Sequence, residues 1–294
     1  MTLDTTKLTA QTTTQTTSQQ SGGVVGTLSP SSLIANAAAI TATYSEVGYL
    51  YLAPGAYRDD TYTAVDSATG DCITSTSGDG NLADTLVGGK YGCSIGNKGA
   101  VSLGRFIPDH FTISAAPTVA ACAVSSTPFS YFGEDGFTTS FGLTAQNLSN
   151  GITQNYTGVF AKLNLTSYVS YGFSSSALPA GSTLTSGAAG ASGTWVNGSA
   201  SVSAGQQISR PNAPTAETFV TVFAAPNDGE VSVSAATAVG AATSLRYGQL
   251  KLKNAYGSEL LALPISLQAQ YWTGSYYITN TADSCTAIPH PALR

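Results

Sequence analysis

Few residues in this sequence combine a type and a spacing that could support catalysis. His110 follows Asp109, and in catalytic sites a carboxylate often orients an imidazole. No G-x-S-x-G turn supplies a nucleophilic serine. Neighbouring side chains on a strand point to opposite faces, so Asp109 is badly placed to hold His110. We therefore expect a structural histidine and no catalytic residue.

Paired carboxylates give no better indication of an enzyme. A glycosidase needs two carboxyl groups that face each other across a sugar bond. Glu46 and Glu259 are isolated and far apart in the sequence, and nothing in the pattern brings them together. We expect the protein not to be an enzyme and to need no cofactor.

Aspartates are concentrated in the glycine-rich stretch from residue 59 to residue 99. Oxygen ligands on such loops suit calcium, which makes Asp66, Asp71 and Asp79 weak calcium candidates. No complete calcium-loop motif is present, and Gly-Asp-Gly turns also arise for conformational reasons alone. Neither His110 nor His290 has zinc-site spacing. Solvated turns without a metal are the expected state.

The four cysteines favour an oxidising compartment. Cys72, Cys93, Cys122 and Cys285 allow three disulfide pairings and show no C-x-x-C spacing. We favour Cys72–Cys93 and Cys122–Cys285, because each bond would then close one structural unit. The alternative is four buried free thiols.

Composition excludes several classes of function. Charged residues make up 9% of the 294 residues, against roughly 25% in an ordinary soluble domain, so hydroxyl and amide groups must supply the surface polarity. That profile is associated with extracellular β-rich proteins. The net charge is −5, and the few Lys and Arg are scattered, which argues against nucleic-acid binding. No apolar run is long enough for a membrane helix, and the first residues do not form a signal peptide. The protein therefore either stays in the cytosol or is an internal piece of a longer secreted protein, and the four cysteines favour the second option.

Periodicity predicts an all-β fold. Alternating or β-branched runs recur between turn residues, for example at residues 47–52, 110–115, 138–147 and 217–226. The runs at 157–165 and 230–237 are also predicted to be strands. Residues 174–207 are small and polar, which predicts a long loop or an irregular meander with short strands. Residues 59–99 are expected to be loops.

The clearest alternation lies near the end of the sequence. Leu261, Leu263, Ile265, Leu267, Ala269 and Tyr271 share one side of an extended chain. This predicts a strand with one face in a core, and Pro264 suggests an edge or a bulge. Together the runs predict two antiparallel β-sandwich, immunoglobulin-like domains in tandem. The first covers residues 1–103, with a loop-rich, disulfide-linked end, and the second covers residues 104–294.

Aromatic side chains offer a second interpretation. Rings with an apolar face and a polar tip can stack on sugars. The candidates for such exposed rings are Tyr168, Tyr171, Trp195, Trp272, Tyr276 and Tyr277. The alternative to a structural role is therefore a carbohydrate-binding adhesin module.

Six motifs in order carry a family resemblance. They are ITATYSEVGYLYL, GRFIPDHFTI, FSYFGEDGF, NYTGVFAKLNL, LRYGQLKLKNAYGSELLALPISLQAQYW and YITNTADSCT. From about Ile40 to Thr286 the chain resembles the C-terminal region of the MshQ family, from the biogenesis system of the mannose-sensitive haemagglutinin (MSHA) type IV pilus. Glu134 departs from the pattern, since an amide is expected there.

The resemblance implies a structural or adhesive module of an exported protein, at the surface of a Gram-negative bacterium. It implies pilus or other cell-surface proteins as partners, with surface glycans as a further possibility. It implies no catalytic residue. Neither nucleic-acid binding nor membrane insertion of this segment is expected.

Overall fold

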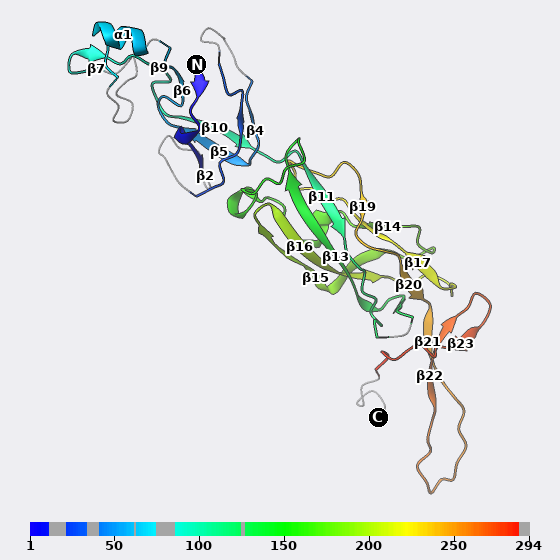
Figure 1. Ribbon diagram of the computed structural model, residues 1–294. Helices are drawn as coiled ribbons and strands as arrows, with labels where there is room; N and C mark the ends of the chain where they lie inside the picture. The colour runs from blue at the N-terminus through cyan, green and yellow to red at the C-terminus, as the bar shows by residue number, and fades with distance from the viewer. Residues whose placement is uncertain (12–21, 34–40, 62, 75–85, 125–126, 288–294) are drawn as a thin grey trace. The chain divides into compact units, whose positions relative to one another are not determined.

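The protein divides into two compact units, drawn in Figure 1. A computed structural model describes residues 1–11, 22–33, 41–61, 63–74, 86–124 and 127–287. The first unit comprises residues 1–110, 145–162 and 195–199, and the second comprises residues 111–144, 163–194 and 200–294. The boundary expected between residues 103 and 104 stays a prediction.

Short strands build most of the first unit. They are β1 (Thr2–Leu3), β2 (Leu8–Gln11), β3 (Leu28–Ser29), β4 (Thr43–Tyr44), β5 (Gly48–Leu52), β6 (Tyr57–Asp59), β7 (Leu86–Val87), β8 (Lys90–Tyr91), β9 (Ile95–Gly96) and β10 (Val101–Phe106). They pair in the orders β1-β6-β9, β10-β5-β2, β3-β4 and β7-β8. The helices are the 3₁₀ turn η1 (Thr5–Lys7) and α1 (Thr63–Thr69).

The core of the first unit lies around the central strand β5. Leu50 and Leu52 of this strand are buried with Leu8, Leu28 and Tyr57. The strand predicted at residues 47–52 therefore forms, and it is buried on both faces, since neighbouring Leu50, Tyr51 and Leu52 are all buried.

The remaining strands belong mainly to the second unit, and β13, β15 and β16 are long. They are β11 (His110–Ala115), β12 (Ser130–Tyr131), β13 (Asp135–Gln146), β14 (Ser174–Ser175), β15 (Leu184–Val196), β16 (Ser199–Ile208), β17 (Thr218–Val220), β18 (Val222–Ala224), β19 (Thr237–Ala238), β20 (Thr243–Arg246), β21 (Gly248–Leu252), β22 (Leu267–Trp272) and β23 (Tyr277–Thr279). The sheets are β11-β13-β16-β15, β12-β20-β17, β14-β18-β19 and β21-β22-β23. The turns η2 (Gly158–Phe160) and η3 (Tyr168–Tyr171) complete the elements.

Strand β13 shows why these residues fold as a sheet. From Phe137 onward its residues alternate between buried and half-buried positions along its whole length. Phe141 is 1% exposed and meets the rings of Tyr171 and Phe173 edge to face, at centroid distances of 5.6 and 6.1 Å. This geometry adds to the stabilisation from burying apolar area.

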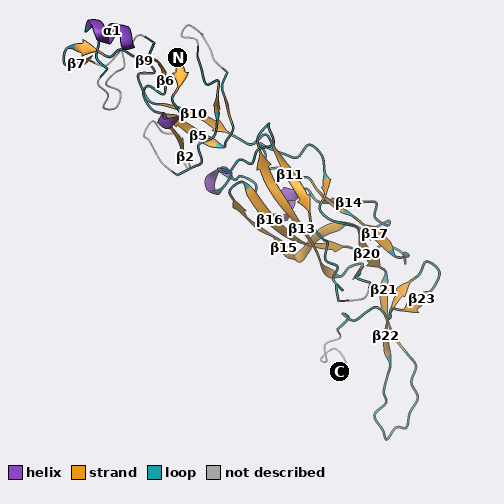
Figure 2. Ribbon diagram, viewed as in Figure 1, coloured by secondary structure: helices purple, strands orange, loops and turns teal. Residues whose placement is uncertain are grey.

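The all-β prediction is confirmed, as the strands in Figure 2 make plain. Many antiparallel strands with one buried face form the layers of a β-sandwich fold. In the part of the chain that the structure describes, no helix is long and apolar enough to cross a membrane.

Four sequence predictions about elements are wrong. Residues 184–208 form two long strands, β15 and β16, rather than a loop or short strands. A Cβ on Gly205 would lie 2.9 Å from the Ala189 Cβ, so small residues serve close packing here. Residues 157–165 contain the turn η2 in place of a strand, and Thr63–Thr69 form α1 within the expected loops. The strand predicted at residues 230–237 does not form, because this segment contains only an isolated bridge at Ser232 and the first residue of β19. For β15 and β16, pairing within the sheet outweighs the low strand propensity of their small residues.

The strand predicted at residues 261–271 forms only in part. β22 begins at Leu267, and the residues before it form a loop in which Leu261 is 75% exposed and Ile265 57% exposed. Pro264 is therefore not at a strand edge or in a bulge but in this loop. The predicted core face does not exist for residues 261–266.

Candidate functional site

Both ring nitrogens of His110 are engaged by the protein. Nδ1 lies 2.8 Å from Asp109 Oδ2, and Nε2 lies 3.1 Å from Gln146 Oε1. The expectation that Asp109 cannot hold His110 is wrong, because Asp109 precedes strand β11 and strand alternation does not govern its side chain. The imidazole ties β11 to the end of β13, which is a structural arrangement.

The two disulfides are those that the sequence favours. Cys72 and Cys93 are joined with Cα atoms 5.1 Å apart, and Cys122 and Cys285 with Cα atoms 5.5 Å apart. The second bond closes a much longer loop, with a sequence separation of 163 against 21. Stable disulfides form in oxidising compartments, so the bonds indicate an extracellular or periplasmic protein.

The aspartates that were weak calcium candidates do not form a cluster among the described residues. Asp66 lies in α1, and its backbone carbonyl accepts hydrogen bonds from Asp71 N and Thr69 Oγ1. The Asp71 carboxylate accepts a bond from the same hydroxyl. Asp79 lies outside the described residues, as does His290.

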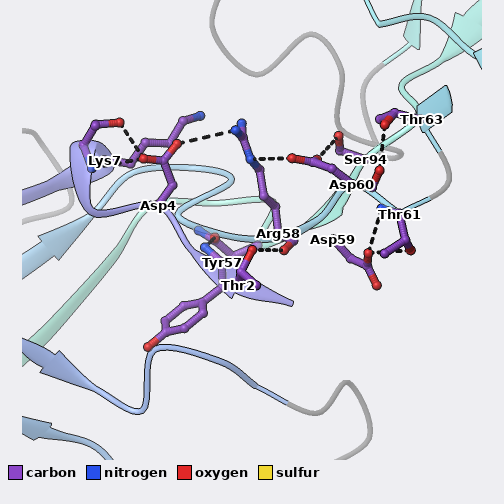
Figure 3. A network of polar contacts seen from close by, with 12 residues as sticks. Thr2, Asp4, Lys7, Tyr57, Arg58, Asp59, Asp60, Thr61, Thr63 and Ser94 are labelled. Atoms are coloured by element: carbon purple, nitrogen blue, oxygen red, sulfur yellow. Dashed lines mark hydrogen bonds and ion pairs between the residues drawn. The ribbon is translucent and has the colours of Figure 1, made fainter.

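Asp60, from the same stretch, shares a single arginine with Asp4 (Figure 3). Arg58 lies 3.1 Å from Asp60 Oδ2 and 3.6 Å from Asp4 Oδ2. Asp60 also accepts a hydrogen bond of 2.5 Å from Ser94 Oγ. The arginine thus pairs with two carboxylates that lie far apart in the sequence, and it links β6 to the first residues of the chain.

Glu46 is a buried carboxylate that holds backbone. It is 5% exposed, and its two oxygens accept hydrogen bonds of 2.9 and 3.0 Å from the N–H groups of Gln154 and Asn155. The Asn155 side chain in turn bonds both the N–H and the carbonyl of Val24, at 2.8 Å each. These bonds fix the segment 153–156 within the first unit. Glu259, by contrast, is exposed on the loop after β21.

The second unit contains a charged group in an apolar setting. Arg246 is 7% exposed and lies between the rings of Phe129 and Tyr271, with its Cζ 4.5 and 4.7 Å from their centroids. Its Nε lies 2.8 Å from Glu217 Oε1, and its Nη1 donates to Asn280 Oδ1 at 2.9 Å. A buried arginine needs such pairing, because an uncompensated charge in the interior is costly.

The contacts around Glu217 set its ionisation. Burial acts to raise the pKa of this carboxyl, but hydrogen bonds from Ser244 and Arg246 and the arginine charge outweigh it, and the pKa lies below its usual value. The Glu217 carboxyl is therefore ionised at neutral pH.

The hydrogen bonds continue from Asn280 into the last described residues. Asn280 Nδ2 donates to Tyr131 Oη at 2.6 Å, and that hydroxyl donates to Asp283 Oδ2 at 2.9 Å. Burial is the main cause of a raised pKa of Tyr131, so the hydroxyl keeps the proton that it donates to Asp283. Asp283 also accepts bonds from the N–H groups of Cys285 and Thr286. The network ends beside the Cys122–Cys285 disulfide.

Glu134, where the resemblance predicts an amide, has a defined contact. Its Oε2 accepts a 2.8 Å hydrogen bond from the Tyr131 N–H. Burial raises the pKa of this carboxyl, with a smaller opposing effect from that bond. The carboxylate closes the turn between β12 and β13.

The aromatic residues proposed for sugar stacking do not form a flat platform. Tyr171 is fully buried, and Trp195 meets Tyr156 edge to face at 86°. Trp272 and Tyr277 are likewise inclined at 65°. Tyr276, 64% exposed, is the one large exposed ring among the candidates, all of which are described. Sugar stacking favours exposed ring faces, so this geometry does not favour the carbohydrate interpretation.

Comparison with known families identifies two domains. The family model of the third domain of DUF6701 matches residues 80–250, more than half of the chain. The chain belongs to the DUF6701 family. The model of the fourth DUF6701 domain matches residues 246–294. No curated protein and no solved structure matches significantly.

The Arg246 network therefore lies where the two DUF6701 domains meet, since their matches overlap at residues 246–250. Glu217 and Tyr131 belong to the third domain, while Asn280 and Asp283 belong to the fourth. The disulfide crosses the same boundary. The candidate site is thus a domain junction joined by one covalent bond and by a polar network around the buried Arg246 and Asn280.

Sequence reasoning identified the disulfide but missed Arg246, Glu217 and Asn280. One signal was present: in a chain with 11 Lys and Arg, Arg246 stands between Leu245 and Tyr247 in a strand-like run. A cation in such a run indicates a buried partner, because charged residues are rarely buried unpaired. Its polar partners Glu217 and Asn280 lie about 30 residues before and after it, and nothing in the sequence around them identifies them as partners.

Proposed function

We propose that this chain is a structural module of an exported MshQ-like protein, and that it presents or anchors surface components of an MSHA-type pilus. The observation that carries the proposal is the fixed junction of the third and fourth DUF6701 domains. The Cys122–Cys285 disulfide and the hydrogen bonds of Tyr131 with Asn280 and Asp283 join residues of the two domains. A module that holds surface components at a defined place needs domains that are joined firmly to each other.

The remaining support comes from the sequence. Six motifs in order resemble the C-terminal region of MshQ proteins, and the two disulfides suit a protein that functions outside the cytoplasm. The mechanism is presentation: weakly charged β-sandwich units hold a partner at a defined place. Turnover of a substrate has no part in it.

The proposal is tested in a bacterium that encodes this chain together with an MSHA-type pilus. An epitope-tagged protein should be accessible to antibody on intact cells and should co-purify with pili sheared from those cells. Deletion of the gene should reduce surface pili or pilus-dependent adhesion. Exclusive recovery from the cytoplasm, or unchanged pili after deletion, would overturn it.

A matched pair of variants connects this role to the junction. Cys122→Ala with Cys285→Ala removes the bond across the domain boundary, while Cys72→Ala with Cys93→Ala removes a bond within the first unit. We expect the first pair to lower pilus display more than the second. An equal effect of both pairs would show that the junction has no special role.

A further inference from the structure

The hairpin β21–β22 forms an amphipathic arm, which we define as residues 248–272. Its register pairs Leu250 with Ala269 and Leu252 with Leu267. Directly paired residues share a face, so these four side chains lie on one apolar face. The opposite face carries Gln249, Lys251, Gln268 and Gln270. A two-sided pattern of this kind is typical of a sheet whose apolar face is covered.

The apolar face of the arm is open. Leu250 is 53% exposed and Leu252 65% exposed. In the loop between the strands, Tyr256, Leu260 and Leu261 are 91%, 84% and 75% exposed. Figure 1 shows this loop running outward from β21 and β22, with no other described segment beside it. Contiguous exposed apolar groups of this kind mark a binding surface.

A pocket lies at the base of the same face. It has a volume of about 240 Å³, and its lining includes Leu250, Ala269, Tyr131 and Arg210. Pockets for small molecules have volumes of about 300–1,000 Å³, so this one is small for a free ligand but suits one or two apolar side chains. The pocket is continuous with the interface at which Gly248 packs against the Tyr131 ring.

We propose that a second copy of this chain covers the apolar face. The two arms pack face to face and antiparallel, so that the loop of each copy lies over the base of the other. Leu260 or Leu261 of the partner subunit then enters the pocket beside Leu250 and Ala269. The arrangement is a closed, two-fold symmetric dimer, in which each arm gives and receives the same contacts. This role goes beyond the presentation function proposed above.

Charge favours a second copy as the occupant. The apolar face carries no charged residue, so two copies of it meet without repulsion, while Lys251 points to the opposite face. The exposed Glu259 sits beside Leu260 in the loop, and Arg210 lines the base pocket. Antiparallel arms bring Glu259 of the partner subunit towards Arg210, which is a complementary contact across the interface.

Sedimentation velocity of the full chain tests the proposal across about three decades of protein concentration. We expect a reversible dimer in the micromolar range. The double variant Leu260→Ser, Leu261→Ser should weaken the dimer by about tenfold or more, because two apolar side chains lose their buried site. Leu252→Glu should have a comparable effect, because it places a charge on the face.

The control uses equally exposed apolar residues elsewhere. Leu148 is 81% exposed and Val169 83% exposed, so Leu148→Ser with Val169→Ser removes similar surface without touching the arm. This control should leave the dimer unchanged. Circular dichroism should show the same fold in all variants, since every altered side chain is exposed in the single chain.

A chain that sediments as a monomer up to about 100 times the expected micromolar dissociation constant would overturn the proposal, and some other polypeptide would then be the occupant of the arm. A dimer that the arm variants leave intact would overturn it as well, because association would then use a different surface.

Discussion

Removal of the Cys122–Cys285 disulfide should destabilise the second unit by about 5 kcal/mol. In the chain-entropy model, a cross-link stabilises a protein by restricting the unfolded chain, and the effect grows with the logarithm of loop length. The separation is 163 residues here and 21 for Cys72–Cys93. The same relation gives about 3 kcal/mol for the shorter loop. The double variant Cys122→Ala, Cys285→Ala is the perturbation.

The sequence offers a clean assay for this effect. It has two tryptophans, and Trp195 lies in the first unit while Trp272 lies in the second. In a Trp195→Phe background, fluorescence during urea unfolding therefore reports the second unit. The midpoint should fall, and the slope against urea should rise because the unlinked chain exposes more surface.

The matched variant Cys72→Ala, Cys93→Ala should leave the Trp272 transition almost unchanged, because its disulfide belongs to the first unit. The reasoning is refuted if removal of Cys122–Cys285 costs less than about 1 kcal/mol. It is refuted equally if both disulfide variants shift the Trp272 transition by the same amount.

Three further predictions follow from contacts in the second unit. Arg246→Met should cost about 3 kcal/mol, the low end of the range for a broken buried pair, because the Glu217 side chain is 32% exposed. Lys251→Met, at an exposed cation, should change stability by less than about 0.5 kcal/mol in the same denaturation assay. The pKa of Glu217 is lowered in the folded state. The carboxylate therefore stabilises the fold above its unfolded pKa, and this stabilisation is lost as the pH falls through the folded pKa. Glu217→Gln should flatten the dependence of the melting temperature on pH below about 4.5. Phe141→Ala should cost about 3–5 kcal/mol by leaving a cavity against Tyr171, whereas Phe219→Ala, at a ring that is 66% exposed, should cost less than about 1 kcal/mol by thermal unfolding.

Local patterns located the strands whose burial is regular. The strand predicted at residues 110–115 has the bounds of β11, and the run at 138–147 lies almost entirely within β13, because alternate side chains there enter one core. The same rule failed for β15, whose Gly, Ala and Ser residues carry little strand propensity. That strand forms because β16 pairs with it, and its small residues allow the close approach seen at Gly205 and Ala189.

The candidate junction was accessible from the sequence only through its cysteines. Four cysteines allow three pairings, which is a short list of possibilities. Arg246, by contrast, finds Glu217, Asn280 and the rings of Phe129 and Tyr271 at separations that no local pattern encodes. Buried polar partners depend on which strands become neighbours, and that is a property of the whole fold.

The sequence by itself determined that this protein is built of β-sheets and that its cysteines could pair within two units. Alternation and turn residues act over a few neighbours along the chain, so they can be recognised in the sequence alone. Only the tertiary structure decided that Leu267–Trp272 pairs in a sheet while Leu261 and Ile265, in the same alternating run, remain exposed. Alternation records which side chains could share a face, whereas burial requires a second layer to cover that face.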